Sequence, residues 1–232
     1  RGDSSLVDMT ESKPKALIQV GGKTILQNLV SGLNEVGVRD VLVVRGYAKE
    51  SVSGQNFRTL DNDEYASTKD LYSLYLAKEE LVGKSVVLYG DSMFRNHVLQ
   101  DLLKAEGEVA IVVDADVRQD GQRRDYARCN ERYTNDFLNK RIFLRDIFST
   151  DSPGVNDGEW VGAMVVNEKG LDKFKELMDQ LVKRDDFKQL TLVDALRRYV
   201  RVGQVEVVYT KGGWIDVDTI KDLEEAGNFG VG

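Results

Sequence analysis

The stretch SVVLYGDSMFRNHVLQDLLKAEGEVAIVVDAD, residues 85–116, decides the fold. It opens with an apolar run over Ser85–Tyr89 and continues with apolar residues at helical spacing between Val98 and Leu103. A second apolar run follows over Val109–Val113. A buried strand, an amphipathic helix and another buried strand in succession predict a β-α-β unit, whose strands belong to one sheet.

The same alternation continues on both sides of this stretch. Further strands are predicted by the short apolar runs at 16–20, 41–44, 57–60, 160–166 and 205–209. Helical spacing of apolar residues predicts helices at 25–33, 71–78, 171–181, 192–199 and 220–226, with Thr191 as a candidate N-cap. The sequence therefore predicts an α/β fold with a mixed, mostly parallel sheet flanked by helices. Ligands of such sheets bind beyond the carboxyl ends of the strands.

One segment, residues 115–158, departs from this regularity. It is rich in Asp, Arg and Asn, and only Arg141–Phe148 is notably apolar. We interpret it as an excursion over the sheet edge, a candidate lid or dimer contact. We expect residues 1–232 to form one domain around a single core.

Composition excludes several functional classes. The 232 residues carry 32 Lys+Arg and 39 Asp+Glu, a formal charge of −7, which argues against a nucleic acid as the main partner. No apolar run approaches the roughly 18 residues of a membrane span, and no secretory leader is present, so we expect a cytoplasmic protein without a membrane partner. Cys129 and His97 are the only cysteine and histidine, which excludes an intramolecular disulfide and a His-based metal cage.

The first candidate constellation is basic. Arg1-Gly2 and Lys13-Pro14-Lys15 place cationic side chains beside a glycine. Backbone N–H groups near a glycine, together with ammonium or guanidinium groups, can hold a polyphosphate. The alternative is a frayed basic terminus.

Two further constellations are acidic. Gly90-Asp91-Ser92 directly follows a predicted strand, and Asp216 and Asp218 alternate before the last predicted helix. A carboxylate or two plus phosphate oxygens is the usual way of binding Mg²⁺. The alternative for Asp91 and Asp218 is that each caps a helix. Taken together, the three constellations describe a site for Mg²⁺ and a triphosphate.

A rival metal motif is Asp114-Ala115-Asp116, which follows the strand predicted at Val109–Val113. Many nucleotide-sugar glycosyltransferases hold Mn²⁺ with an Asp-x-Asp motif at a strand end. With 39 acidic residues in the chain, however, such a short motif also arises by chance.

The motifs carry a family resemblance over nearly the whole chain. They are Lys13–Leu17, Val20–Leu26, Val43–Tyr47, Asn62–Thr68 with Leu71 and Ser73–Tyr75, Gly90-Asp91, Phe94-Arg95, Val112–Asp116, Arg124–Tyr126 and Gly158–Gly162. This set resembles the nucleotidyltransferase superfamily. Within it, the resemblance is strongest to the cytidylyltransferase domains associated with phosphoenolpyruvate phosphomutase in phosphonate biosynthesis.

The resemblance implies a Rossmann-like nucleotidyltransferase fold. It also implies Mg²⁺-dependent transfer of CMP from CTP to a phosphonate of the 2-aminoethyl or 2-hydroxyethyl type. Arg1 and Lys15 match the triphosphate-binding residues, with Gly2 and Gly90 beside them. Asp91 and Asp218 match the metal-binding acids, with Asp216 nearby. The nucleotide and acceptor pockets would be lined by Asn62, Asp63, Tyr65, Thr68, Ser73, Glu159 and Trp160.

The opening of the chain departs from this family. Members begin with an apolar strand that feeds a glycine-rich loop, whereas this sequence opens at Arg1-Gly2, so we expect further residues upstream. The acceptor stays open between a phosphonate and phosphocholine or a sugar phosphate. A non-catalytic nucleotide-binding module is the alternative outside enzymes. A homodimer and a fused mutase or transaminase domain are also left open.

Overall fold

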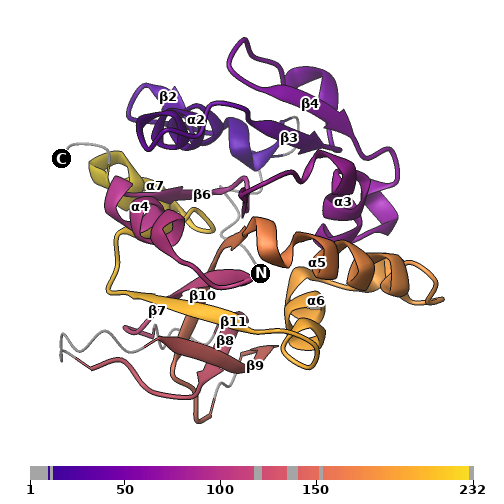
Figure 1. Cartoon of the computed structure of the whole chain (residues 1–232). Coiled ribbons are helices and arrows are strands. Elements are labelled where there is room, and N and C mark those ends of the chain that lie inside the picture. Colours follow the sequence, from indigo (N-terminus) through magenta and orange to yellow (C-terminus); the bar gives the residue numbers. More distant parts are fainter. Residues whose placement is uncertain (1–9, 11–12, 118–121, 135–140, 152–153, 230–232) are drawn as a thin grey trace. The chain divides into compact units, whose positions relative to one another are not determined.

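The computed structural model describes residues 10, 13–117, 122–134, 141–151 and 154–229. Figure 1 labels the helices and strands of the chain, which divides into two compact units. Unit 1 comprises Arg1–Ala66, Tyr89–Gln100 and Gly213–Gly232, and unit 2 comprises Ser67–Leu88 and Asp101–Gly212. Helices and strands alternate along the described residues, which confirms the predicted α/β class. The predicted single domain over residues 1–232 stays a prediction.

Unit 1 contains short strands around one long helix. The helix α2 (Ile25–Glu35) follows a hairpin of β1 (Gln19–Val20) and β2 (Lys23–Thr24). Gly21 and Gly22 have positive φ values, which suits the tight turn between these strands. Thr24 begins α2 with a capping box, because its hydroxyl accepts from the Gln27 N–H and its own N–H donates to the Gln27 side chain.

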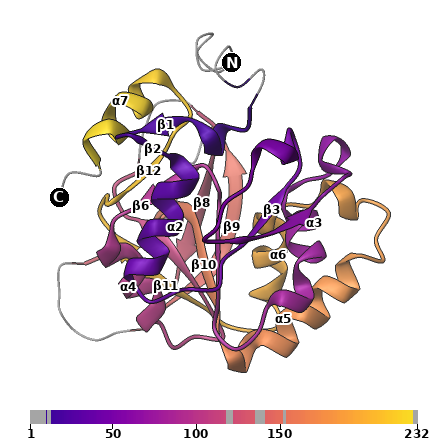
Figure 2. The same cartoon turned by 90° about the horizontal axis from the view of Figure 1, so that it is seen from above.

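Two strand pairs complete unit 1. β6 (Ser92–Phe94) pairs antiparallel with β12 (Trp214–Asp216), and β3 (Leu42–Arg45) pairs parallel with β4 (Arg58–Asp61). Figure 2 shows α7 (Ile220–Phe229) beside β1 and β12, with which it is in contact. A core beneath these elements consists of Ile18, Val20, Ile25, Met93, Ile215, Val217 and Ala226. Short 3-10 turns lie at Lys15–Leu17 and Lys49–Ser51.

Unit 2 is built on a six-stranded sheet with the order β5-β10-β7-β11-β9-β8. Their bounds are Ser85–Leu88, Gly158–Val166, Val109–Asp114, Val205–Thr210, Ile142–Thr150 and Arg124–Cys129. β7 and β10 are buried along their whole length, as the apolar runs predicted. The helices are α3 (Asp70–Leu76), α5 (Glu168–Leu181) and α6 (Leu192–Tyr199), and α4 (Asn96–Lys104) contributes residues to both units. α5 and α6 contact each other in Figure 1, and Thr191 caps α6 as predicted.

The direction of the strands differs from the expectation. The sheet of unit 2 is mixed, but only its β7–β11 pairing is parallel among the pairings described. β10 lies antiparallel between β5 and β7, because it enters the sheet from the irregular segment and not from a helical crossover. The prediction of a mostly parallel sheet is therefore wrong, although the α/β class holds.

The segment 115–158 also differs from the expectation of an excursion. Its β8 and β9 pair antiparallel and extend the sheet beyond β11. Both strands are only partly buried, so exposed residues interrupt their apolar pattern and hide the strands from a search for apolar runs. β3, predicted as buried on both faces, is half-buried because its described ladder contains only β4. In the described ranges, no helix has the length and apolar character needed to cross a membrane.

Candidate active site

Four of the predicted site residues converge in unit 1. Lys15 begins the 3-10 turn after Pro14, Asp91 directly precedes β6, and Asp216 ends β12. The β6–β12 ladder pairs Asp216 with Ser92, and the Val217 N–H donates to the Asp91 carbonyl at 3.4 Å. This ladder brings together acidic residues that are far apart in the sequence.

The side chains meet at the ammonium group of Lys15. Its Nζ lies 2.5 Å from a carboxylate oxygen of Asp218, 3.1 Å from Asp91 and 3.4 Å from Asp216. The Lys15 side chain is 22% exposed, so the cluster is only partly accessible to solvent. Three carboxylates therefore share one cation.

The charges of the cluster perturb one another. Burial, together with the nearby charge of Asp91, raises the pKa of Asp216 to about 8, although Lys15 opposes the shift. Burial by itself would lower the pKa of Lys15, but Asp91, Asp216 and Asp218 raise it by more, so its pKa lies above the ordinary range. Lys15 is thus a permanent cation, and the three carboxylates hold up to two negative charges in excess.

The structure also decides whether the aspartates are helix caps. Thr219 is the residue that caps α7: its hydroxyl accepts from the Asp222 N–H, and the Asp222 carboxylate accepts from the Thr219 N–H. The carboxylate of Asp218 instead contacts Lys15. Asp91 is separated from α4 by the strand β6, so it does not cap that helix. The Thr-x-x-Asp spacing of Thr219 and Asp222 is close to that of a capping box and could have been found in the sequence.

The cluster fits a divalent cation when a phosphate-bearing ligand supplies part of the coordination shell. No group of three or more His, Cys, Asp or Glu side chains within the described residues is arranged to hold a metal by itself. The carboxylates of Asp91, Asp216 and Asp218 surround an ammonium instead. Mg²⁺ usually takes only one or two protein carboxylates and completes its shell with phosphate oxygens and water. The excess negative charge and the hard oxygen donors therefore suit Mg²⁺ bound together with a phosphate-bearing ligand.

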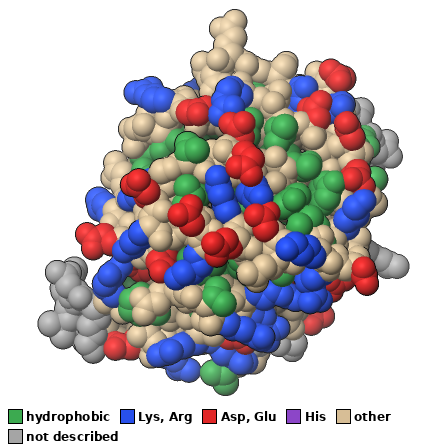
Figure 3. All heavy atoms as spheres, turned by 45° about the vertical axis from the view of Figure 1, so that its right-hand side comes forward, with side chains coloured by type: hydrophobic (Ala, Val, Ile, Leu, Met, Phe, Trp, Pro, Cys, Tyr) green, Lys and Arg blue, Asp and Glu red, His purple; other side chains and the backbone are tan. Residues whose placement is uncertain are grey.

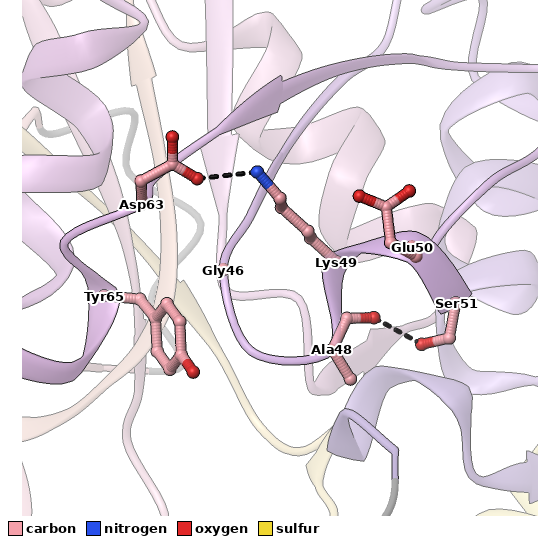
Figure 4. A pocket seen from close by; sticks show the side chains of 7 residues that line it. All are labelled: Gly46, Ala48, Lys49, Glu50, Ser51, Asp63 and Tyr65. Carbon is pink, nitrogen blue, oxygen red and sulfur yellow. Dashed lines mark hydrogen bonds and ion pairs between the residues drawn. The ribbon is translucent and has the colours of Figure 1, made fainter.

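A second group of predicted residues lines a hollow of about 440 Å³ in unit 1 (Figure 4). Asp63 and the exposed Tyr65, which follow β4, face Lys49 and its neighbours, which follow β3. Lys49 Nζ donates to Asp63 at 2.6 Å and lies 3.1 Å from Asp61. Nothing in the sequence pattern had singled out Lys49. Asn62, by contrast, is buried and its side-chain oxygen accepts from the Glu64 N–H, which supports the turn.

The other predicted pocket residues belong to unit 2. Thr68 precedes α3 and Ser73 lies within it, both half-buried. Glu159 is buried and accepts from Arg124 Nη1 at 2.8 Å. Trp160 is also buried, and its indole N–H donates to the Ala163 carbonyl at 3.1 Å. These contacts favour packing roles for Glu159 and Trp160, and a substrate contact for either stays a prediction.

In the rival motif, backbone N–H groups bond to both carboxylate oxygens of Asp114. One carboxylate oxygen of Asp114 accepts from the Asp116 N–H at 2.9 Å, and the other accepts from the Gly212 N–H at 3.1 Å. Asp114 is buried, so it fastens the ends of β7 and β11 to each other. This arrangement does not favour an Asp-x-Asp metal site.

Two predicted residues and the surface charge remain to be placed. Arg1 and Gly2 lie outside the described residues, and Gly90 is exposed next to Asp91. Figure 3 shows acidic and basic side chains interspersed over one face, with basic ones more frequent in its lower part. A net charge of −7 therefore leaves room for local cationic regions that can meet an anionic ligand.

Comparison with known proteins agrees with this fold. The chain belongs to the MobA-like NTP transferase domain family, whose model matches residues 7–184. This confirms the resemblance to nucleotidyltransferases. The solved structure of CTP:phosphocholine cytidylyltransferase from Streptococcus pneumoniae has a TM-score of 0.71 and 22% identity, covering 94% of this chain and 90% of that one.

Two relatives in sequence bear names of cytidylyl-transferring enzymes. A choline-phosphate cytidylyltransferase of Streptococcus pneumoniae is 37% identical over 101 residues, which is 42% of this chain and 44% of the relative. A CMP-5'-(3-aminopropyl)phosphonate synthase of Streptomyces rubellomurinus is 30% identical over 123 residues, which is 50% of this chain and 20% of the relative. These matches span less than half the length of either relative.

Proposed function

We propose that the protein is a cytidylyltransferase, which transfers CMP from CTP to an anionic oxygen of a small phosphonate or phosphate ester. The observation that carries the proposal is the cluster of Lys15 with Asp91, Asp216 and Asp218, assembled by the β6–β12 ladder. Membership in an NTP transferase family and the names of the two relatives support the same class of reaction.

The reaction makes few chemical demands on side chains. The acceptor oxygen is already an anion, so it forms the new bond to the α-phosphorus of CTP without a general base. The bond from the α-phosphorus to the bridging oxygen breaks, and pyrophosphate leaves. Positioning and neutralisation of charge are then the main contributions of the protein, which agrees with a chain that has one histidine.

Lys15 would neutralise phosphate oxygens, since its ammonium stays charged across the physiological range. Asp91 and Asp218, with Asp216 beside them, would hold Mg²⁺. When bound, the ion would neutralise charge on the α-phosphate and on the leaving pyrophosphate. The hollow beside Asp63 and Tyr65 offers an exposed aromatic ring and carboxylates for a nucleotide base or an acceptor head group.

The acceptor is proposed as a phosphonate of the 2-aminoethyl or 2-hydroxyethyl type, on the strength of the motif resemblance and the aminopropylphosphonate relative. Phosphocholine is the second candidate, favoured by the higher identity to the choline-phosphate enzyme over 101 residues. A cytoplasmic location, a homodimer and a fused partner domain stay predictions.

Pyrophosphate release tests the proposal. CTP, ATP, UTP and GTP are each supplied with Mg²⁺ and with 2-aminoethylphosphonate, 2-hydroxyethylphosphonate or phosphocholine. We expect release with CTP and a phosphonate. Release with phosphocholine alone would select the second candidate, and no release with CTP and any acceptor would refute the proposal.

Two variants connect the activity to the cluster. Asp91→Asn is expected to lower turnover by roughly 100-fold or more, because it removes a carboxylate that would hold Mg²⁺ beside the reacting phosphates. Asp40→Asn is the matched control, since Asp40 pairs with Arg58 on the surface of the same unit. Equal turnover in the two variants would contradict the assignment of the site.

A further inference from the structure

The contacts of Lys15 raise a conflict with its role toward phosphate. Its ammonium has three N–H donors, and three carboxylates lie within reach of them, at 2.5, 3.1 and 3.4 Å. A group committed in this way has no donor left for a triphosphate. Lys15 must therefore leave at least part of this cluster before it can bind a nucleotide.

We propose that Lys15 is the built-in counter-cation of the ligand-free site and competes directly with a divalent cation for Asp91, Asp216 and Asp218. This inference rests on the proposed function only in taking a divalent cation as the second ligand of these carboxylates. It adds that metal and nucleotide binding are coupled through one lysine side chain.

The charge balance explains the competition. Without Lys15, three carboxylates would face one another with up to three negative charges and no cation, which is costly at a half-buried site. With Lys15, the excess falls to at most two charges, and the cluster is held together. A divalent ion among the same oxygens would lie within a few ångströms of the ammonium, and the two cations would repel each other.

The coupling follows from this repulsion. When a divalent ion takes the place of the ammonium among the carboxylates, Lys15 is free to neutralise phosphate. Conversely, a triphosphate that draws Lys15 away uncovers the carboxylates for the ion. Each ligand thus favours the other, and the reciprocity is required thermodynamically.

The test is the affinity of the full chain for Mn²⁺ in the absence of nucleotide. Mn²⁺ prefers the same oxygen ligands as Mg²⁺, and free Mn²⁺ can be counted by electron paramagnetic resonance. Lys15→Met removes the competing cation and keeps most of the length of the side chain. We expect it to bind Mn²⁺ at least tenfold more tightly than the wild type.

Three further variants separate the competition from other effects. Lys15→Gln is a second neutral replacement, so the result does not depend on the folding of one variant. Lys15→Arg keeps the charge and should bind Mn²⁺ about as weakly as the wild type. Lys221→Met removes an equal charge from α7, three residues after Asp218 in the sequence, where Lys221 is exposed and lies 3.6 Å from Glu225. It should leave the affinity within about twofold.

Thermal melting provides a readout that is independent of binding. Without metal, Lys15→Met should melt at a lower temperature than the wild type, because its carboxylates lack a cation. Saturating Mn²⁺ should raise its melting temperature by more than that of the wild type. Unchanged Mn²⁺ affinity in both folded neutral variants would overturn the inference.

The outcome is separable from that of the proposed function. Tighter Mn²⁺ binding by Lys15→Met, in a protein whose wild type releases no pyrophosphate from any nucleotide, would refute the cytidylyltransferase and leave the competition standing. Pyrophosphate release by the wild type, with no gain of Mn²⁺ affinity in the neutral variants, would do the reverse.

Discussion

Replacing Arg124 by Met tests whether Glu159 is a structural residue or a substrate-binding one. The pair lies in unit 2, where Arg124 belongs to β8 and Glu159 to β10. The two side chains are only 10% and 4% exposed, and the contact between them is 2.8 Å. Arg124→Met keeps most of the side-chain volume but leaves the Glu159 carboxylate buried without this cation.

The expected magnitude follows from burial. Removing one partner of a buried ion pair costs about 3–5 kcal/mol of unfolding free energy, because the remaining charge stays desolvated. At about 2–4 °C per kcal/mol for a chain of this size, the melting temperature should fall by roughly 6–20 °C. Glu159→Gln, which leaves no buried carboxylate, should cost less, and adding it to Arg124→Met should recover part of the loss.

Tryptophan fluorescence during urea unfolding gives the measurement. Trp160 is buried beside Glu159 in unit 2, whereas Trp214 belongs to unit 1. In a Trp214→Phe background the signal therefore reports the unfolding of unit 2. The control is Arg132→Met, since Arg132 contacts Asp157 at 3.0 Å but is 72% exposed, and it should cost less than about 1 kcal/mol.

One result would refute this reasoning. If Arg124→Met destabilised unit 2 no more than Arg132→Met does, the buried pair would contribute little to the fold. Glu159 would then have no structural role to explain its burial, and its predicted contact with the substrate would become the stronger interpretation.

Three further predictions concern single residues. Burial raises the pKa of Cys129 to about 11 from an ordinary value of 9.0. At pH 8 the Cys129 thiol should therefore react with a thiol reagent about 100-fold more slowly in the folded protein than in urea. Comparable rates in the two states would contradict this prediction. Thr219→Ala removes the cap of α7 and should cost about 1 kcal/mol in thermal unfolding, whereas Thr219→Ser should restore it. Gly158→Ala would place a Cβ 2.6 Å from the Asp114 carbonyl oxygen and should cost about 1–3 kcal/mol in urea unfolding, and a neutral effect would show that β7 and β10 can separate freely.

The elements predicted from the sequence are those with an uninterrupted apolar signal. Val109–Val113 lies in a strand that is buried at every position, and the helix around Leu171–Leu181 buries one apolar face. β8 and β9 were missed because both strands are only partly buried, so exposed polar residues interrupt their apolar pattern. Strand direction was misjudged because periodicity reports burial along one strand and contains nothing about its neighbours.

Asp91 was predicted from its position after an apolar run, and Asp216 and Asp218 from their alternation before the last predicted helix. Lys15 was predicted at the same site, but its direct contact with these carboxylates was not, since Lys15 lies 76 residues from Asp91 and 201 from Asp216. The same spacing rule also left the capping alternative open for Asp218. Only the contacts of Thr219 with Asp222 show that the cap of α7 is elsewhere and that Asp218 is available to the site.

The sequence by itself determined the α/β class, the strands that carry the core and the residue types available for binding phosphate and metal. These properties depend on local periodicity and on side-chain chemistry, and both can be read directly from the amino-acid sequence. Tertiary structure decided the direction of the strands, the burial of Glu159 and Trp160, and the meeting of three carboxylates at one ammonium. Those properties depend on which distant segments pair, and the energy of such contacts arises only when folding excludes water from between them.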